Sequence, residues 1–193
     1  MSSPDAGRPS PASPAVADTS RRTAVLDAAL PTFARFGYRK TSMEEVARAA
    51  QISRPGLYFL FSSKEELFRA AVIQLLERDL AAVEHVLADA ARPLPERLAE
   101  AFDQWAGRYV GPAARDITEV IEANPGLLGE TTETAPRRFE ALVTDAVAVE
   151  TGREKARAVA RTLNSASIGL KHQARSREFF LERLRVAIGL LVG

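Results

Sequence analysis

The chain has 193 residues, of which 46% are hydrophobic, so it is long and apolar enough to fold as one large or two small domains. It contains no cysteine, which excludes disulfides, thiolate metal sites and cysteine nucleophiles. No apolar run approaches the ~20 residues needed to cross a bilayer, and the first 18 residues lack a secretory pattern. We therefore expect a cytoplasmic protein with no membrane partner.

Charge is distributed unevenly along the chain, although the net charge is only +1. Residues 20–70 carry nine basic and five acidic side chains, a local charge of +4, which leaves −3 for the remainder. A basic head on a slightly acidic body suits a nucleic-acid partner at one end of the molecule. Local imbalances of this size also arise by chance, so charge alone does not decide the partner.

The first 18 residues are rich in Pro, Ser and Ala and predict a disordered tail. Beyond them the sequence predicts an all-α protein, because no segment alternates apolar and polar residues as a strand does. The sequence also contains no internal repeat. The first helix is expected at about 20–36, where apolar residues recur at helical spacing. Pro31 inside it predicts a bend, and Gly37 ends it.

Two short helices are expected next. The first spans about 43–50, and its start carries two overlapping capping-box patterns, Thr41-x-x-Glu44 and Ser42-x-x-Glu45. The second begins after Ser53, a residue type that caps helices well, and has Pro55 in its first turn, where a missing N–H is harmless.

Six further helices are expected, separated by Pro, Gly and capping residues. They lie at about 63–91, 94–109, 113–123, 135–150, 151–174 and 176–191. Capping patterns mark three of the starts, at Ser63-x-x-Glu66, Thr151-x-x-Glu154 and Ser176. Because no flexible linker is evident, we place the boundary between a domain of residues 19–70 and a domain of residues 71–193 inside the long helix that begins at 63.

The segment Met43–Phe61 has the pattern of a helix-turn-helix, with two short helices joined by a tight turn. In this motif the N-terminal residues of the second helix meet base edges in the major groove. Arg54 could donate two hydrogen bonds to guanine, Gly56 lets the backbone approach closely, and Tyr58 and Lys64 could reach phosphates. The alternative is an ordinary helical hairpin with a solvated basic face.

The same region resembles the DNA-binding domain of the TetR (tetracycline-repressor) family over residues 21–71. The resemblance is carried by AALPTFARFGYRKTSMEEVARAA and ISRPGLYFLFSSKEELFRAAV. It implies a homodimeric, all-helical transcription regulator, usually a repressor, that binds double-stranded DNA at a palindromic operator. It also implies a C-terminal helical domain that holds a small-molecule effector and forms the dimer.

The resemblance implies a specific set of DNA-binding residues. Phosphate contacts fall to Thr41, Tyr58 and Lys64, and groove contacts to Arg54, Pro55, Gly56 and Phe59. Ser53 would cap the recognition helix, and the signature pair Thr41-Ser42 adds Ser42 to the set. The sequence departs from the family where Gln51 replaces the turn glycine, and where Phe59 and Leu60 are apolar.

The last two predicted helices resemble the dimerisation pair of that family. Two stripes recur at helical spacing: Ala156, Ala160, Leu163, Ser167 and Leu170 on one helix, and Phe180, Leu184, Ala187 and Leu191 on the other. Paired with a symmetry mate, they could form a four-helix bundle. The alternative is that both stripes face the chain's own core.

Phe102, Trp105 and Tyr109 share one helix face and could line a pocket for the effector, or could simply be core. Asp116, Glu119 and Glu122 could attract a cationic ligand, or could form a solvated helix face. His85 and His172 are the only histidines, and nothing in their surroundings suggests a metal site. We therefore expect no metal and no cofactor.

Two other classes of function compete with a DNA-binding regulator. An enzyme is disfavoured because no glycine-rich phosphate loop, nucleophile elbow or metal-ligand cluster is present in the sequence. A helical protein-binding module without DNA binding is supported only by Gln51 and by the Phe59-Leu60 pair. Such a module would show no sequence preference and no salt-dependent DNA binding.

Overall fold

The computed structural model describes residues 14–192, except for the side chains of residues 14–17 and 112–116. Within these residues the chain is helical and has no strand, which confirms the predicted all-α class. The α-helices are α1 (Pro14–Phe36), α2 (Met43–Ala49), α3 (Arg54–Leu60), α4 (Lys64–Ala88), α5 (Leu94–Trp105), α6 (Pro112–Glu122), α7 (Thr131–Thr151), α8 (Arg153–Gln173) and α9 (Arg177–Val192). Two 3₁₀ turns are η1 (Gly107–Tyr109) and η2 (Pro125–Leu127).

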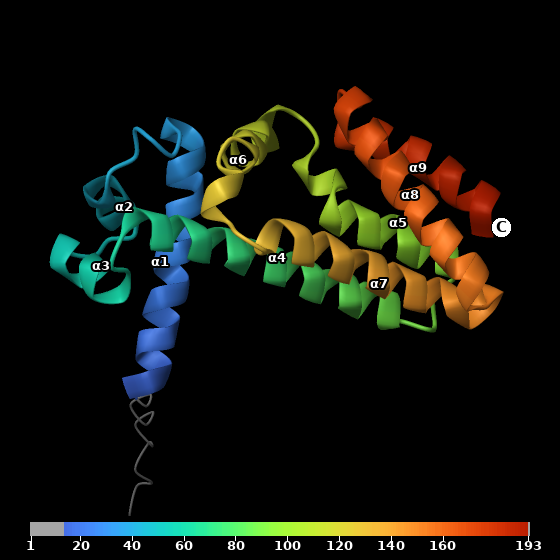
Figure 1. Cartoon of the computed structure of the whole chain (residues 1–193), viewed down its shortest axis with the longest axis horizontal. Coiled ribbons are helices and arrows are strands. Elements are labelled where there is room, and N and C mark those ends of the chain that lie inside the picture. Colours follow the sequence, from blue (N-terminus) through green and yellow to red (C-terminus); the bar gives the residue numbers. More distant parts are fainter. Residues whose placement is uncertain (1–13, 193) are drawn as a thin grey trace, which may run out of the picture.

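The helices gather at two ends of an elongated molecule, as Figure 1 shows. Helices α1, α2 and α3 lie at one end, and α5, α7, α8 and α9 lie at the other. Helix α4 runs from the first group into the second and packs against α1, α5 and α7. One continuous helix therefore joins the two groups. The sequence analysis expected such a connection, because it found no flexible linker.

Each end of the molecule has its own hydrophobic core. The first core includes Val25, Phe33, Val46, Leu57, Phe61 and Phe68, and the second includes Val83, Phe102, Phe139, Leu163 and Phe180. Helix α4 contributes Val72 to the first core and Leu80 to the second. Val120 of α6 and Leu128 also belong to the first core, so part of the region after residue 71 packs on the N-terminal helices.

Several predicted helix boundaries are corrected. Helix α1 begins at Pro14 instead of about residue 20, so the part of the expected tail from 14 to 18 is helical, while residues 1–13 lie outside the described part of the chain. Proline is tolerated at a first helical position because its missing N–H would have no partner there. Helix α5 ends at Trp105 and not at 109, and α7 begins at Thr131 and not at 135.

Serine hydroxyls cap four of the helices at the predicted positions. Ser53, Ser63 and Ser176 each accept a hydrogen bond from the backbone N–H three residues later. Ser42 and Glu45 form the reciprocal capping box, and the hydrogen bonds donated by Ser42 hold the pKa of Glu45 below its ordinary value. These local sequence signals therefore placed the helix starts correctly.

Two predicted caps are wrong because the threonine hydroxyl donates elsewhere. Thr41 donates to the carbonyl oxygen of Gly37 at 2.9 Å. Thr151 donates to the carbonyl oxygen of Val147, and Gly152 with φ of 79° precedes α8 in its place, without any side-chain cap. In both cases the competing acceptor is a carbonyl four residues earlier. No helix among the described residues is long and apolar enough to cross a membrane.

Candidate nucleic-acid interface

The turn between α2 and α3 is closed by two backbone hydrogen bonds. The N–H of Ile52 donates to the carbonyl of Ala47 at 3.0 Å, and the N–H of Gln51 donates to that of Arg48 at 3.1 Å. This pair of bonds is the Schellman arrangement, which needs a left-handed residue after the helix. Gln51 occupies that position with φ of 56° and is the one non-glycine residue with positive φ in the described chain. The turn therefore keeps its geometry without the usual glycine.

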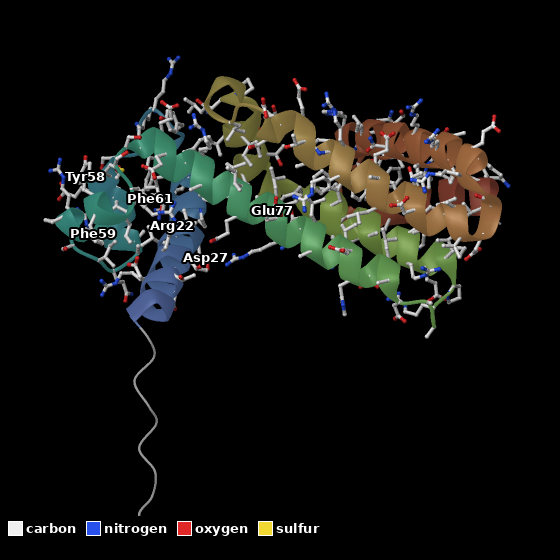
Figure 2. All side chains as sticks on the ribbon, turned by 60° about the horizontal axis from the view of Figure 1, so that its bottom comes forward. Arg22, Asp27, Tyr58, Phe59, Phe61 and Glu77 are labelled. Carbon is white, nitrogen blue, oxygen red and sulfur yellow. The ribbon has the colours of Figure 1, made fainter. Side chains whose placement is uncertain are left out.

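Helix α3 is held against the domain by its buried side and leaves the opposite side open. Leu57 within the helix and Phe61 directly after it are fully buried. Arg22 of α1 donates from Nη1 to the carbonyl oxygen of Leu60 at 2.8 Å, and its guanidinium lies 4.1 Å from the centre of the Phe61 ring. Figure 2 shows Arg22 beside Phe61. These contacts fix the C-terminal end of α3 to α1.

The open side of α3 presents a row of exposed side chains. Ser53, Arg54, Pro55 and Tyr58 are exposed, and Phe59 is exposed over 83% of its surface. The guanidinium of Arg54 lies 5.7 Å from the centre of the Tyr58 ring, which matches their spacing of one helical turn. In Figure 2, Tyr58 and Phe59 point away from the body of the molecule at its outer end. The structure thus brings these predicted contact residues onto one accessible surface.

Gly56 and Ser42 complete the accessible part of the predicted set. Gly56 is half-buried, and a Cβ atom at this position would come within 3.1 Å of the Ser53 hydroxyl that caps the helix. Ser42 is exposed at the start of α2, where its hydroxyl is engaged with Glu45.

Thr41 and Lys64 have other partners than the predicted phosphates. Thr41 is only 1% exposed, and its hydroxyl donates within the domain, so the predicted phosphate contact through this hydroxyl is wrong for the observed conformation. The Lys64 ammonium donates to the carbonyl oxygens of Tyr38, Arg39 and Thr41 at 3.0, 3.3 and 3.1 Å. Lys64 therefore ties the loop between α1 and α2 to the start of α4.

A cavity of about 290 Å³ lies in the C-terminal half of the molecule, between α4, α5, α6 and α8. Trp105 and Tyr109 line it, as the sequence predicted. Phe102 does not, because it is fully buried and packs edge-on against Phe139 with ring centres 4.9 Å apart. The remaining walls are mostly aliphatic, and Thr118, Asn164 and Ser167 add polar groups.

Asp79 of α4 is a cavity residue that the sequence analysis missed. It is 1% exposed, accepts a hydrogen bond from the Tyr109 hydroxyl, and pairs with Arg108 at 2.9 Å. Burial raises the pKa of Asp79, and the bond from Tyr109 and the charge of Arg108 partly oppose this effect. The signal in the sequence was a carboxylate on the apolar face of a long helix, beside Leu76, Leu80 and Val83.

Of the two acidic residues of α6 whose side chains are described, one lines this cavity and the other does not. Glu122 lines it and lies 4.0 Å from the ammonium of Lys171, which lines the cavity from α8. Glu119 lies instead in a shallow depression between α6 and the loop after α1. The side chain of Asp116 lies outside the described part of the structure. Among the described residues there is no cluster of side chains suited to hold a metal ion.

The stripes predicted to form a dimer interface face the chain's own core, as the alternative reading had it. Ala156, Ala160, Leu163, Ser167, Phe180 and Leu184 are buried, and Leu170, Ala187 and Leu191 pack half-buried against the same core. Six of the nine side chains are thus buried inside the chain itself, whereas Leu170, Ala187 and Leu191 keep some exposed surface, and the interface prediction stays a prediction. The outward sides of the helices carry other apolar residues: Ile168 on α8, and Phe179, Val186 and Leu190 on α9.

Comparisons with known proteins agree with the geometry of the N-terminal domain. The family described as bacterial regulatory proteins of the tetR family matches residues 25–71, which run from α1 through the turn into α4. RutR of Escherichia coli K12, an HTH-type transcriptional regulator, is 39% identical over 59 residues, covering 31% of this chain and 28% of RutR. YfiR of Bacillus subtilis 168, an uncharacterized HTH-type transcriptional regulator, is 32% identical over 124 residues, covering 64% of this chain and 51% of YfiR.

The likeness to solved structures extends over most of the fold. A regulator from Mesorhizobium loti MAFF303099 assigned to the TetR family superposes with a TM-score of 0.75 at 20% identity, covering 90% of this chain and 96% of that one. At this identity the likeness shows the fold alone. The chain spans 28% and 51% of the lengths of RutR and YfiR. Residues 25–71 are thus similar in sequence to the tetR family of bacterial regulatory proteins, and the chain shares the fold of a regulator assigned to that family.

Proposed function

We propose that the protein is a homodimeric transcription regulator, acting as a repressor, that binds a palindromic operator through α3 and responds to a small-molecule effector. The observation that carries the proposal is the exposed row Ser53, Arg54, Pro55, Tyr58 and Phe59 on a recognition helix whose other side is locked into the domain. Such a row is what a helix needs to enter a major groove. Bacterial DNA lies in the cytoplasm, so the protein would act there.

The roles proposed for these side chains follow from their chemistry. Arg54 stands at the first position of α3, where an arginine can donate two hydrogen bonds to a guanine edge. Tyr58 lies one turn further along, and its hydroxyl can donate to a phosphate. The capped N-terminus of α3 adds backbone N–H groups that favour an anion. Lys64 would support the interface indirectly, by holding the loop after α1.

A dimer is proposed because one recognition helix reads only half of a palindrome. Two copies would place their α3 helices about 34–36 Å apart, one turn of the double helix. We assign the contact to the outward sides of α8 and α9, where Val186 and Leu190 are 60% and 82% exposed and follow each other by one turn. The exposed side of α8 carries small residues, including Thr162 and Ser165, which allow helices to approach closely.

The effector is proposed to bind in the cavity lined by Trp105 and Tyr109. One turn of α4 connects this cavity with the DNA-binding domain. Asp79 of that turn forms part of the cavity wall, while the neighbouring Arg78 forms an ion pair with Asp27 of α1 at 2.5 Å, to which Gln74 also donates. Figure 2 shows Asp27 on α1 below α4.

An effector that moves this turn would change how α1 and α3 sit relative to α4. Its effect on DNA affinity then equals its differential affinity for the two arrangements. The relatives are described as transcriptional regulators, which favours this role over catalysis.

The proposal is tested by selecting duplexes from a random-sequence pool with the full-length protein. We expect one palindromic sequence to be enriched, and we expect Tyr58→Ala to bind it more weakly. Arg157→Ala, which removes an exposed arginine from α8, is the matched control and should bind like the wild type. If no sequence is enriched and binding is insensitive to salt, the protein is instead a helical protein-binding module.

A further inference from the structure

We infer that Phe59 reads the 5-methyl group of thymine, so that the operator contains at least one thymine in each half whose methyl group is required. This inference rests on the proposed function and adds the base that this side chain recognises. It starts from Phe59 being 83% exposed, the largest exposed fraction of any aromatic side chain among the described residues. Removal of an exposed phenyl ring from water is favourable, and a binding partner that covers the ring achieves this removal.

The position of the ring selects the kind of partner. Phe59 follows Pro55 by one helical turn, so the two exposed apolar residues share one strip of α3. Arg54 and Tyr58 form the neighbouring strip and carry the hydrogen-bonding groups. A recognition helix with one polar and one apolar strip matches the floor of a major groove, in which thymine methyl groups are the apolar feature beside the polar base edges.

The surroundings of Phe59 favour DNA over a protein surface. Arg48, Arg54, Arg39 and Lys40 are exposed on the same small domain, and residues 20–70 carry a net charge of +4. A protein-binding patch would be expected to bring further apolar residues around the ring. In α3 the other large apolar residues are instead turned inward: Leu57 is fully buried and Leu60 is half-buried.

The test uses operator duplexes in which single thymines are replaced by deoxyuridine, which differs only by the missing methyl group. We expect wild-type binding to weaken about fourfold at one thymine per half-site, the factor that corresponds to burial of one methyl-sized group. For Phe59→Ala the same replacement should have no effect. Val149→Ala removes a side chain that is 85% exposed on α7, and should retain the full deoxyuridine effect.

The outcomes separate this inference from the proposed function. An enriched operator without any sensitive thymine, or with the same sensitivity in Phe59→Ala, would overturn the inference and leave the proposed function standing. Failure to enrich any operator would instead refute the proposed function. Thermal unfolding of Phe59→Ala should match the wild type, because so exposed a ring has little packing to lose. A change in self-association of Phe59→Ala, with operator binding unchanged, would show that the ring contacts protein and would also overturn the inference.

Discussion

Gln51, in the turn between α2 and α3, carries a backbone conformation that suits glycine. Its φ of 56° lies in the left-handed region, which costs a residue with a Cβ atom about 1 kcal/mol or more. The two hydrogen bonds of the turn hold it there. The departure from the family's glycine therefore affects stability more than the geometry of the motif.

Substitution of Gln51 should reveal this strain. We expect Gln51→Gly to raise the free energy of unfolding by up to about 1 kcal/mol, and Gln51→Val to lower it by about 1–2 kcal/mol, because a β-branched residue is the least tolerant of positive φ. Urea denaturation measures both. A less stable Gln51→Gly would show that the glutamine side chain makes a compensating contribution.

Lys64 is a second residue whose role is structural. Its ammonium donates to three carbonyls of the loop after α1, and it lies 4.7 Å from the centre of the Tyr38 ring. We expect Lys64→Met to lower the free energy of unfolding by about 2 kcal/mol, since bonds from a charged donor are lost from a half-buried site. Lys155 is an exposed residue of α8, and Lys155→Met should change the free energy of unfolding by less than about 0.5 kcal/mol. Equal effects would mean that the Lys64 bonds add nothing to stability.

At the scale of elements, the six residues of α4 from Gln74 to Asp79 contact α1, α7 and η1. Gln74 and Arg78 bind Asp27 of α1, and Glu77 pairs with Arg138 of α7 at 2.5 Å. Asp79 binds Arg108 and Tyr109 around η1. All of these contacts are polar, and those made by Gln74, Glu77 and Arg78 are exposed, so this part of α4 can exchange those partners at modest cost in free energy.

The buried carboxyl of Asp79 predicts a pH dependence of stability. Because burial raises its folded pKa above the unfolded value, its contribution is fully present below the unfolded pKa and is lost as pH rises through the folded pKa. Asp79→Asn keeps the size of the side chain and does not titrate. The unfolding free energy of the wild type minus that of Asp79→Asn should therefore fall as the pH rises above about 3.9, the ordinary pKa of an aspartate. A difference that rises with pH would mean that Arg108 outweighs the burial.

The sequence predicted those elements that depend on neighbours along the chain. Ser42, Ser53 and Ser63 cap helices because their partners stand three residues away, within reach of any sequence pattern. The sequence could not show whether Thr41 or Ser42 caps α2, because the burial of Thr41 depends on the packing of α1 against α2. The cavity was found only in part, because Asp79 and Tyr109 are thirty residues apart and only the fold brings them together.

At the scale of the whole molecule, the same limit applies to the two stripes predicted to form the dimer. Apolar spacing on α8 and α9 identified the sides that are buried, such as those with Leu163 and Leu184, but spacing does not say whether the covering surface belongs to the same chain. The tertiary fold covers these sides with α5 and α7. The sides left for a second copy are less regular and carry Val186 and Leu190.

The proposed dimer contact is tested by placing a charge on it. We expect the wild type to sediment as a dimer at micromolar concentration, and Val186→Glu to dissociate at least tenfold more readily because a carboxylate would be buried without a partner. Val149→Glu introduces the same charge at an exposed site on α7 and should remain dimeric. A wild-type monomer, or equal behaviour of the two variants, would contradict this assignment.

The central claim is that α3 binds a specific DNA sequence, and fluorescence anisotropy with the selected operator over a range of salt concentrations tests it most directly. We expect the logarithm of the affinity to fall linearly with the logarithm of salt concentration, with a slope of about −0.9 for each phosphate contacted. Arg54→Ala should weaken binding roughly tenfold or more, whereas Arg157→Ala should match the wild type. Binding that is flat in salt, or equal for operator and scrambled DNA, or unaffected by Arg54→Ala, would contradict the account.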